Sequence, residues 1–205
     1  MIEARPHTIE LPIGYTDSKE VTHKSVTFGH LITGKELFEI ESDPQSALRS
    51  QYDDLILRQS ITEFGSLKRP VPLSVFLALD SIDHDDLNEG LDIFSKKNRE
   101  GREYEILASD KVKLVYGFEH NGLVYDVVEF GPRIIRMDDV EADKLGYEGA
   151  RRHCFLAGKQ IARFSQSDGA SEWLGPVGLD IFEQLLVADI QAIRVAGEVH
   201  RQSFR

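Results

Sequence analysis

One string in the chain has the spacing of a loop that binds nucleotide phosphates. Residues 29–35 read GHLITGK and match the pattern GxxxxGK. Such a loop holds phosphates through its backbone amides and its lysine, and the Ser or Thr after the lysine binds Mg²⁺. Here Glu36 follows Lys35, so the Ser or Thr is missing. The two halves of the chain resemble each other, as described below, and the corresponding residues 131–137 lack both the second glycine and the lysine. We therefore interpret residues 29–35 as an ordinary turn and expect no cofactor.

Three other groups of residues have the types, but not the spacing, that metal binding or catalysis needs. The acidic string from Asp80 to Asp86 lacks the glycine and glutamate of an EF-hand loop, so we interpret it as a solvated helix start with Asp83 as the N-cap. None of the seven histidines is placed at i, i+4 in a zinc pattern. His153 and Cys154 would point about 100° apart on a helix, which favours Cys154 as a core residue. The sequence predicts no catalytic residue and no metal site.

An apolar stripe near the C-terminus is the best candidate for a binding surface. Its members recur at steps of three and four, which predicts one continuous helix over residues 179–197. Part of the stripe must be core, and the remainder would suit a partner helix laid into an apolar groove. Trp173 is either core or an aromatic anchor, because tryptophan is enriched in binding hot spots. The predicted partner-binding residues are Trp173, Leu179, Phe182, Leu186, Ile190 and Ile193.

The charge balance restricts the class of partner. The chain has 24 basic and 35 acidic side chains, for a net charge of -11, and neither half is basic. Nucleic acid would be repelled at long range. No apolar run approaches the roughly 18 residues of a membrane helix, and the N-terminal residues MIEARPHTIE contain no apolar signal region. With a single cysteine, the chain is expected in a reducing cytoplasm, bound to neither nucleic acid nor membrane.

The elements that would position these residues recur along the chain. Residues 9–15 (IELPIGY) and 112–118 (VKLVYGF) share the pattern apolar-charged-Leu-x-apolar-Gly-aromatic at an offset of 103. Later matches keep the same order at offsets of 102, 100 and 106, which indicates duplication of one unit. Chance likeness of two hairpin-plus-helix stretches is the alternative. The later matches pair Val26 with Val128, Phe28 with Phe130, Leu55 with Phe155, Ile61 with Ile161, Phe64 with Phe164, Asp83 with Asp189 and Leu87 with Ile193.

Each half predicts a β-hairpin followed by helices. Ile9, Leu11 and Ile13 alternate with other residues at the period of a strand, and Asn121-Gly122 is a strong hairpin-turn signal. An acidic connection follows each hairpin, and helices are predicted over residues 52–64 and 152–164. We thus predict an α+β fold of two similar lobes, each an N-terminal β-hairpin followed by a small helical bundle. The predicted boundaries are residues 1–98 for the first lobe, 99–110 for a linker and 111–205 for the second lobe.

The first half also resembles a known family, the tail assembly chaperones of Mu-like and P2-like contractile-tailed phages. The likeness covers about residues 8–94: a hairpin reading ELPIGYTD, an acidic connection, a helix and a segment of the form P-x-x-V-x-x-L-x-x-x-D-x-x-x-L. The family is usually one unit of roughly this length, whereas this chain has two, and residues 95–111 have no counterpart. The carriers of the resemblance are Glu10, Leu11, Pro12, Gly14, Val26, Phe28, Leu31, Thr33, Leu55, Pro72, Val75, Leu79, Asp83 and Leu87.

The resemblance implies a non-enzymatic function. Such chaperones bind the long helical tape-measure protein, keep it soluble and promote assembly of tube subunits around it. The expected partners are therefore the tape-measure protein or other tail and baseplate proteins in the host cytoplasm. Surplus apolar surface would also favour a homo-oligomer. The alternatives are a structural baseplate or tail-tip component, located in the virion, and an enzyme without a recognisable motif.

Overall fold

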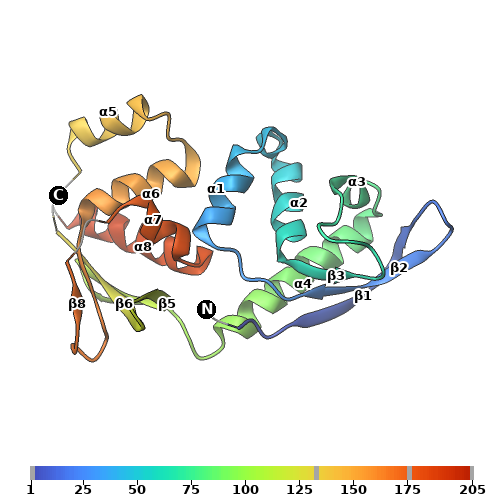
Figure 1. Ribbon diagram of the computed structural model, residues 1–205, viewed down its shortest axis with the longest axis horizontal. Coiled ribbons are helices and arrows are strands. Elements are labelled where there is room, and N and C mark those ends of the chain that lie inside the picture. The colour runs from blue at the N-terminus through green and yellow to red at the C-terminus, as the bar shows by residue number, and fades with distance from the viewer. Residues whose placement is uncertain (1–2, 132–133, 175–176, 204–205) are drawn as a thin grey trace. The chain divides into compact units, whose positions relative to one another are not determined.

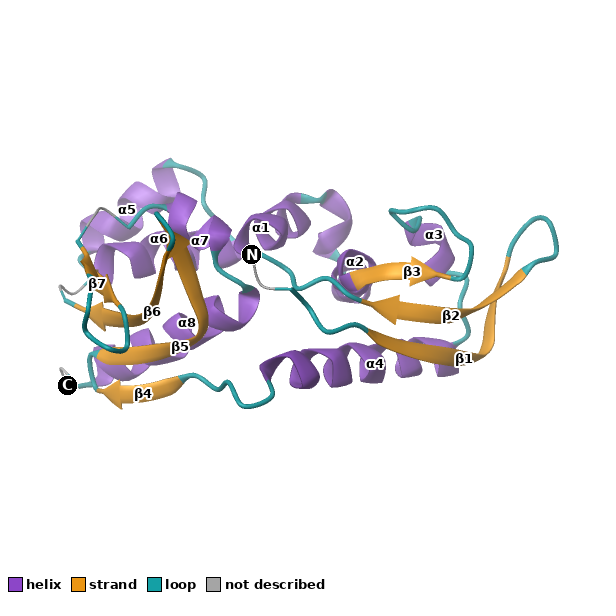
Figure 2. Cartoon of the chain, turned by 60° about the horizontal axis from the view of Figure 1, so that its bottom comes forward, coloured by secondary structure: helices purple, strands orange, loops and turns teal. Residues whose placement is uncertain are grey.

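The computed structural model describes residues 3–131, 134–174 and 177–203, and it is an α+β fold with two antiparallel sheets (Figures 1 and 2). The chain divides into two compact units. Unit 1 comprises Met1–Ile32 and Ile40–Glu100, and unit 2 comprises Thr33–Glu39 and Gly101–Arg205. The helix α1 (Gly34–Ser42) therefore begins in unit 2, although it follows the first hairpin in the sequence.

Unit 1 contains a three-stranded sheet in the order β1-β2-β3. β1 (His7–Thr16) and β2 (Thr22–Phe28) form the predicted hairpin, and β3 (Ile61–Phe64) pairs with β2. The helical elements are η1 (Pro44–Ala47), α2 (Arg49–Ser60), α3 (Leu73–Phe76) and α4 (Ser81–Arg99). The largest fully buried side chains of this core are Leu11, Phe28, Leu57, Ile61, Phe64, Phe76, Leu87 and Phe94.

Unit 2 contains a five-stranded sheet in the order β4-β5-β6-β7-β8. Its strands are β4 (Glu105–Ala108), β5 (Lys111–His120), β6 (Leu123–Phe130), β7 (Ile161–Ser165) and β8 (Glu172–Trp173). The helices are α5 (Arg136–Lys144), α6 (Gly149–Gln160), α7 (Leu179–Gln184) and α8 (Val187–Gln202). Asn121 and Gly122 have φ angles of 52° and 77°, so the predicted hairpin turn is confirmed.

The helices predicted over residues 52–64 and 152–164 are wrong at their C-terminal ends. α2 ends at Ser60 and α6 ends at Gln160, and a short strand follows each helix directly. In β3 the ladder skips one residue, because Phe28 pairs with Ile61 while Thr27 pairs with Glu63. β7 has the same irregularity, where Phe130 pairs with Ile161 while Glu129 pairs with Arg163. A bulge places residues three apart on one face of a strand, which imitates the spacing of a helix.

Two further boundaries differ from the prediction. The single helix over residues 179–197 is two helices, because the chain is extended at Leu185 and Leu186 between α7 and α8. The predicted linker over residues 99–110 is not structureless: α4 continues to Arg99, and β4 occupies Glu105–Ala108. The acidic connections predicted after the hairpins contain α1 in one case and α5 in the other.

The two sheets share a local pattern of pairing. In unit 1, Val26 lies opposite Phe64, and the Gly29 N–H donates to the Ser60 carbonyl at 3.1 Å. In unit 2, Val128 lies opposite Phe164, and the Gly131 N–H donates to the Gln160 carbonyl at 2.7 Å. All four apolar partners are buried in the cores of their own units, namely Val26, Phe64, Val128 and Phe164.

Candidate functional site

A buried carboxylate in unit 2 binds the backbone of an irregular strand. Asp189 lies in the first turn of α8 and is fully buried. Its Oδ1 accepts hydrogen bonds from the N–H groups of Val115 and Tyr116 at 2.7 and 3.1 Å, and its Oδ2 accepts one from Gly117 at 3.0 Å. These donors lie where the register of β5 shifts, so they lack regular ladder partners there. Asp189 therefore satisfies backbone groups that the bulge would otherwise leave unpaired.

Unit 1 contains the same type of contact. Asp83 in α4 is fully buried, and its two carboxylate oxygens accept hydrogen bonds from Ile13 N–H at 3.0 Å and Gly14 N–H at 2.7 Å. The register of β1 shifts between Glu10 and Tyr15 around this point. Gly14 has a φ of +83°, a conformation that favours glycine. We call these two contacts the Asp83 anchor and the Asp189 anchor.

The environment of Asp189 changes its acidity. Burial raises the pKa of the Asp189 carboxyl from 3.8 to about 6, although its three backbone donors act in the opposite direction. The nearby charge of Asp126 also raises this pKa. Asp189 has no basic partner in its hydrogen-bond set, so the anchor is a contact between a carboxyl and backbone rather than an ion pair.

The structure corrects the role assigned to Asp83. The N-cap of α4 is Asp80, whose side chain accepts a hydrogen bond from Ile82 N–H at 2.9 Å. Asp83 lies inside the helix and contacts a strand 70 residues earlier in the chain. The sequence signal for this contact was the predicted repeat, which matched Asp83 with Asp189 and Gly14 with Gly117.

One pair in unit 1 resembles a catalytic arrangement that the sequence did not reveal. Asp54 is buried in α2, and its Oδ1 lies 2.6 Å from Nε2 of His84 in α4. The other ring nitrogen, Nδ1, lies 3.1 Å from the Asn88 side-chain amide, which is a donor. Both ring nitrogens therefore have partners, and no described nucleophile is bonded to either. This arrangement fits a polar contact between α2 and α4.

The string GHLITGK is the start of a capped helix. Thr33 N–H donates to the Glu36 carboxylate at 2.9 Å, and Glu36 N–H contacts Thr33 Oγ1 at 3.4 Å. This is the geometry of a capping box. The Gly34 N–H donates to the Leu185 carbonyl at 2.8 Å. A carboxylate thus lies where a bound phosphate would need free amides, which disfavours a phosphate loop. The interpretation as an ordinary turn is wrong for Gly34 and Lys35, which begin α1.

The apolar stripe predicted to bind a partner is largely inside unit 2. Phe182 and Ile193 are 1% exposed and Ile190 is 9% exposed, while Leu179 and Leu186 are partly buried. The chain itself covers part of this surface through residues 33–39. Thr33 forms a bridge with Leu186, and Phe38 belongs to the same core as Phe182. A partner helix has little of this stripe available to it in the folded unit.

Trp173, the remaining predicted binding residue, is partly exposed on the edge strand β8. Its ring packs edge-on against Phe118 and Phe164, with centroids 5.7 and 6.0 Å away. The ring of His120 lies 6.3 Å away, at the end of β5. The next residue, Leu174, is 71% exposed. Trp173 is therefore both a core contact and part of an accessible apolar surface.

The described residues contain no cluster of metal ligands and no helix suited to a membrane. No group of three or more His, Cys, Asp or Glu side chains in residues 3–131, 134–174 and 177–203 could hold a metal ion. Cys154 is buried in the core of unit 2, as predicted. Over the same residues, none of the helices combines the length and apolar character needed to cross a membrane.

Comparisons with known proteins assign no family. No protein-family model matches the chain, and neither a curated protein nor a solved structure matches it significantly.

Proposed function

We propose that the protein is a non-enzymatic tail assembly chaperone with two related units, which binds the helical tape-measure protein or tail tube subunits during virion assembly. The Asp83 anchor is the observation that carries this proposal. It joins Gly14, in the hairpin that resembles the chaperone family, to Asp83, in the helical segment that also resembles it. The two parts of the resemblance thus belong to one structural unit rather than to unrelated segments.

We further propose that the two units are copies of one ancestral unit. The Asp189 anchor repeats the Asp83 anchor, with a positive-φ glycine at each bulge. β3 in unit 1 and β7 in unit 2 each carry a bulge at the same point of the ladder. Correspondence of sheet order, bulge position and buried carboxylate is improbable for two hairpins that are alike by chance. The strands β4 and β8 extend the sheet of unit 2 only.

The remaining apolar surface supports binding rather than catalysis. Trp173 and Leu174 expose apolar area at one edge of the sheet in unit 2, and Leu123 adds more at the tip of the β5–β6 hairpin. A tryptophan that is held by core contacts and still reaches the surface is typical of a binding hot spot. A protein client of partly apolar character is the ligand class that fits.

Purified particles and assembly intermediates test this proposal. The chain should co-purify with the tape-measure protein when the two are co-expressed, and mass spectrometry of mature particles should not detect it. Presence in mature particles at a fixed copy number would instead establish the structural alternative, a baseplate or tail-tip component. Failure to associate with either tape-measure protein or tube subunits would contradict the chaperone function.

A further inference from the structure

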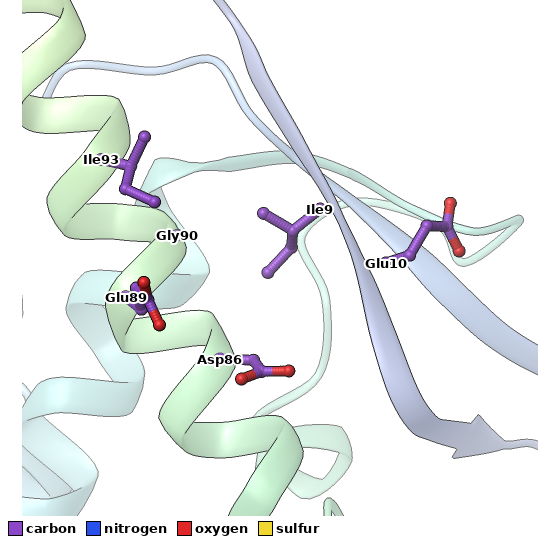
Figure 3. A pocket seen from close by; sticks show the side chains of 6 residues that line it. All are labelled: Ile9, Glu10, Asp86, Glu89, Gly90 and Ile93. Atoms are coloured by element: carbon purple, nitrogen blue, oxygen red, sulfur yellow. The ribbon is translucent and has the colours of Figure 1, made fainter.

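A small groove lies between β1 and α4 within unit 1 (Figure 3). Its volume is about 180 Å³, and its apolar lining consists of Ile9, Gly90 and Ile93. Ile9 points from the strand toward the helix, and Ile93 is 41% exposed at the upper part of the groove. The groove is smaller than the roughly 300–1,000 Å³ typical of sites for whole small molecules, and a single long side chain would fit better.

Glycine at position 90 shapes the groove. Gly90 is buried, and a Cβ added to it would lie 2.7 Å from a ring atom of Phe28 and 3.0 Å from Ile9 Cδ1. The missing side chain lets α4 approach the sheet closely at this turn. The groove therefore has a rigid apolar floor made by two packed elements of one unit.

The rim of the groove is acidic on the side of α4. Asp86 and Glu89 project from α4, and Glu10 projects from β1 on the far side of the strand (Figure 3). In the described parts of the chain, none of these three carboxylates has an ion pair or hydrogen bond. Because Glu10 points away from the two helix carboxylates, the three do not converge as the ligands of one metal ion would.

We propose that this groove binds a lysine or arginine side chain on a partly apolar segment of the client protein. The aliphatic stem would lie against Ile9 and Ile93, and the charged group would reach the carboxylates of Asp86 and Glu89. Long cationic side chains commonly bury their stems in this way while the charged group stays near water. The net charge of -11 adds long-range attraction for a basic segment. This inference rests on the proposed function only in naming the client as a protein.

A charge series of peptides tests the ligand chemistry on the full chain. Three fluorescein-labelled 18-residue helical peptides would share one leucine stripe and carry lysine, glutamine or glutamate beside it. Fluorescence anisotropy should show the lysine peptide binding at least about tenfold more tightly than the glutamate peptide, with affinity falling as salt rises. Amide NMR shifts should change at Ile9 and Gly90. Equal affinity for the three peptides, no binding by any of them, or shifts confined to other regions would overturn the proposal.

Substitutions on one helix supply the matched control. Asp86→Asn combined with Glu89→Gln should weaken binding of the lysine peptide about tenfold. Asp85→Asn combined with Asp92→Asn removes the same charge from exposed positions of α4 that do not line the groove, and it should change affinity less than about twofold. An equal loss in both variants would show general attraction by the acidic protein and would contradict a specific site.

The same variants separate this proposal from the proposed function. If a tape-measure segment binds the Asp86→Asn, Glu89→Gln variant as tightly as the wild type, the groove is not its site, although the chaperone function stands. If the wild type binds the lysine peptide at the groove but binds no tape-measure segment, the groove stands and the proposed function fails.

Discussion

The Asp83 and Asp189 anchors use the same chemistry in different surroundings. Asp189 accepts three backbone N–H groups, and the anchored residue Val115 is 8% exposed. Asp83 accepts two, and the anchored residue Ile13 is 48% exposed. Water can therefore replace part of the Asp83 anchor, whereas the strand residues held by Asp189 have little access to it. The same contact between a carboxyl and backbone is thus deep in the core of unit 2 and closer to the surface in unit 1.

Removal of the carboxylate should lower the free energy of unfolding more at Asp189 than at Asp83, and this is the largest difference that we expect. Asp189→Ala leaves three donors without a partner and should lower the free energy of unfolding by about 4 kcal/mol, while Asp83→Ala should cost about 2–3 kcal/mol. Urea unfolding followed by Trp173 fluorescence reports unit 2, because Trp173 is the single tryptophan and lies in that unit. Far-UV circular dichroism of the same samples reports both units, and a smaller loss of unfolding free energy in Asp189→Ala than in Asp83→Ala would contradict this order.

The pH dependence of stability should distinguish Asp189. Its pKa is raised to about 6 in the folded protein, above the ordinary 3.8, so the folded state holds the proton more tightly than the unfolded state. The contribution of this group is therefore greatest below about pH 4, and it falls as pH rises to about 6, by about 2–3 kcal/mol. Denaturation curves measured across this pH range should show no such fall in stability for Asp189→Asn, and should still show it for Asp83→Asn. An unchanged pH dependence in Asp189→Asn would refute the assignment.

Substitution of the glycine at each bulge should also cost more stability in unit 2 than in unit 1. A Cβ at Gly117 would clash with the backbone oxygen of Tyr125, whereas a Cβ at Gly14 would lie 2.7 Å from both the His23 oxygen and the movable Lys24 side chain. Gly117→Ala should cost about 3 kcal/mol and Gly14→Ala about 2 kcal/mol. Gly122 also has a positive φ but has open space around it, so Gly122→Ala is the control for backbone strain alone, at about 1 kcal/mol. Thermal unfolding would measure all three, and equal losses would mean that steric contact is irrelevant.

The smallest change in stability is expected from a substitution at the start of α1. Glu36→Ala removes the carboxylate that accepts from Thr33 N–H and should cost about 1 kcal/mol. Because residues 33–39 belong to unit 2, the loss should appear in the Trp173 transition. A matched change at Glu39, also on α1 but outside this cap, should have less effect. If Glu36→Ala leaves the Trp173 unfolding transition unchanged, the cap at the start of α1 does not stabilise unit 2.

Sequence patterns predicted the α+β class and the hairpins, because these depend on local signals. Asn121-Gly122 has a direct conformational reason to form a tight turn. β3 and β7 were missed because bulges at Thr62 and Ala162 give buried residues a spacing of three, which short apolar runs share with helices. The break at Leu185 had no glycine or proline to mark it. It depends on contacts with Thr33 and Gly34, about 150 residues earlier in the chain.

The candidate sites depended even more on distant contacts. Asp83 looked like a helix cap because its actual donors, in β1, are remote in the sequence. The predicted stripe contained residues of the right type, but periodicity does not reveal that residues 33–39 cover part of it. The groove between β1 and α4 required the close approach at Gly90, which no local pattern indicates.

Titration of the full chain with a purified tape-measure segment, followed by Trp173 emission, tests the proposed function most directly. Trp173 is partly exposed, so a client that covers it should shift its emission to the blue as water is excluded. We expect a saturable shift at micromolar concentration, and no such shift with a helical segment of equal length and charge from an unrelated protein. Emission that does not respond to any tape-measure segment, together with no heat of binding by calorimetry, would contradict the account.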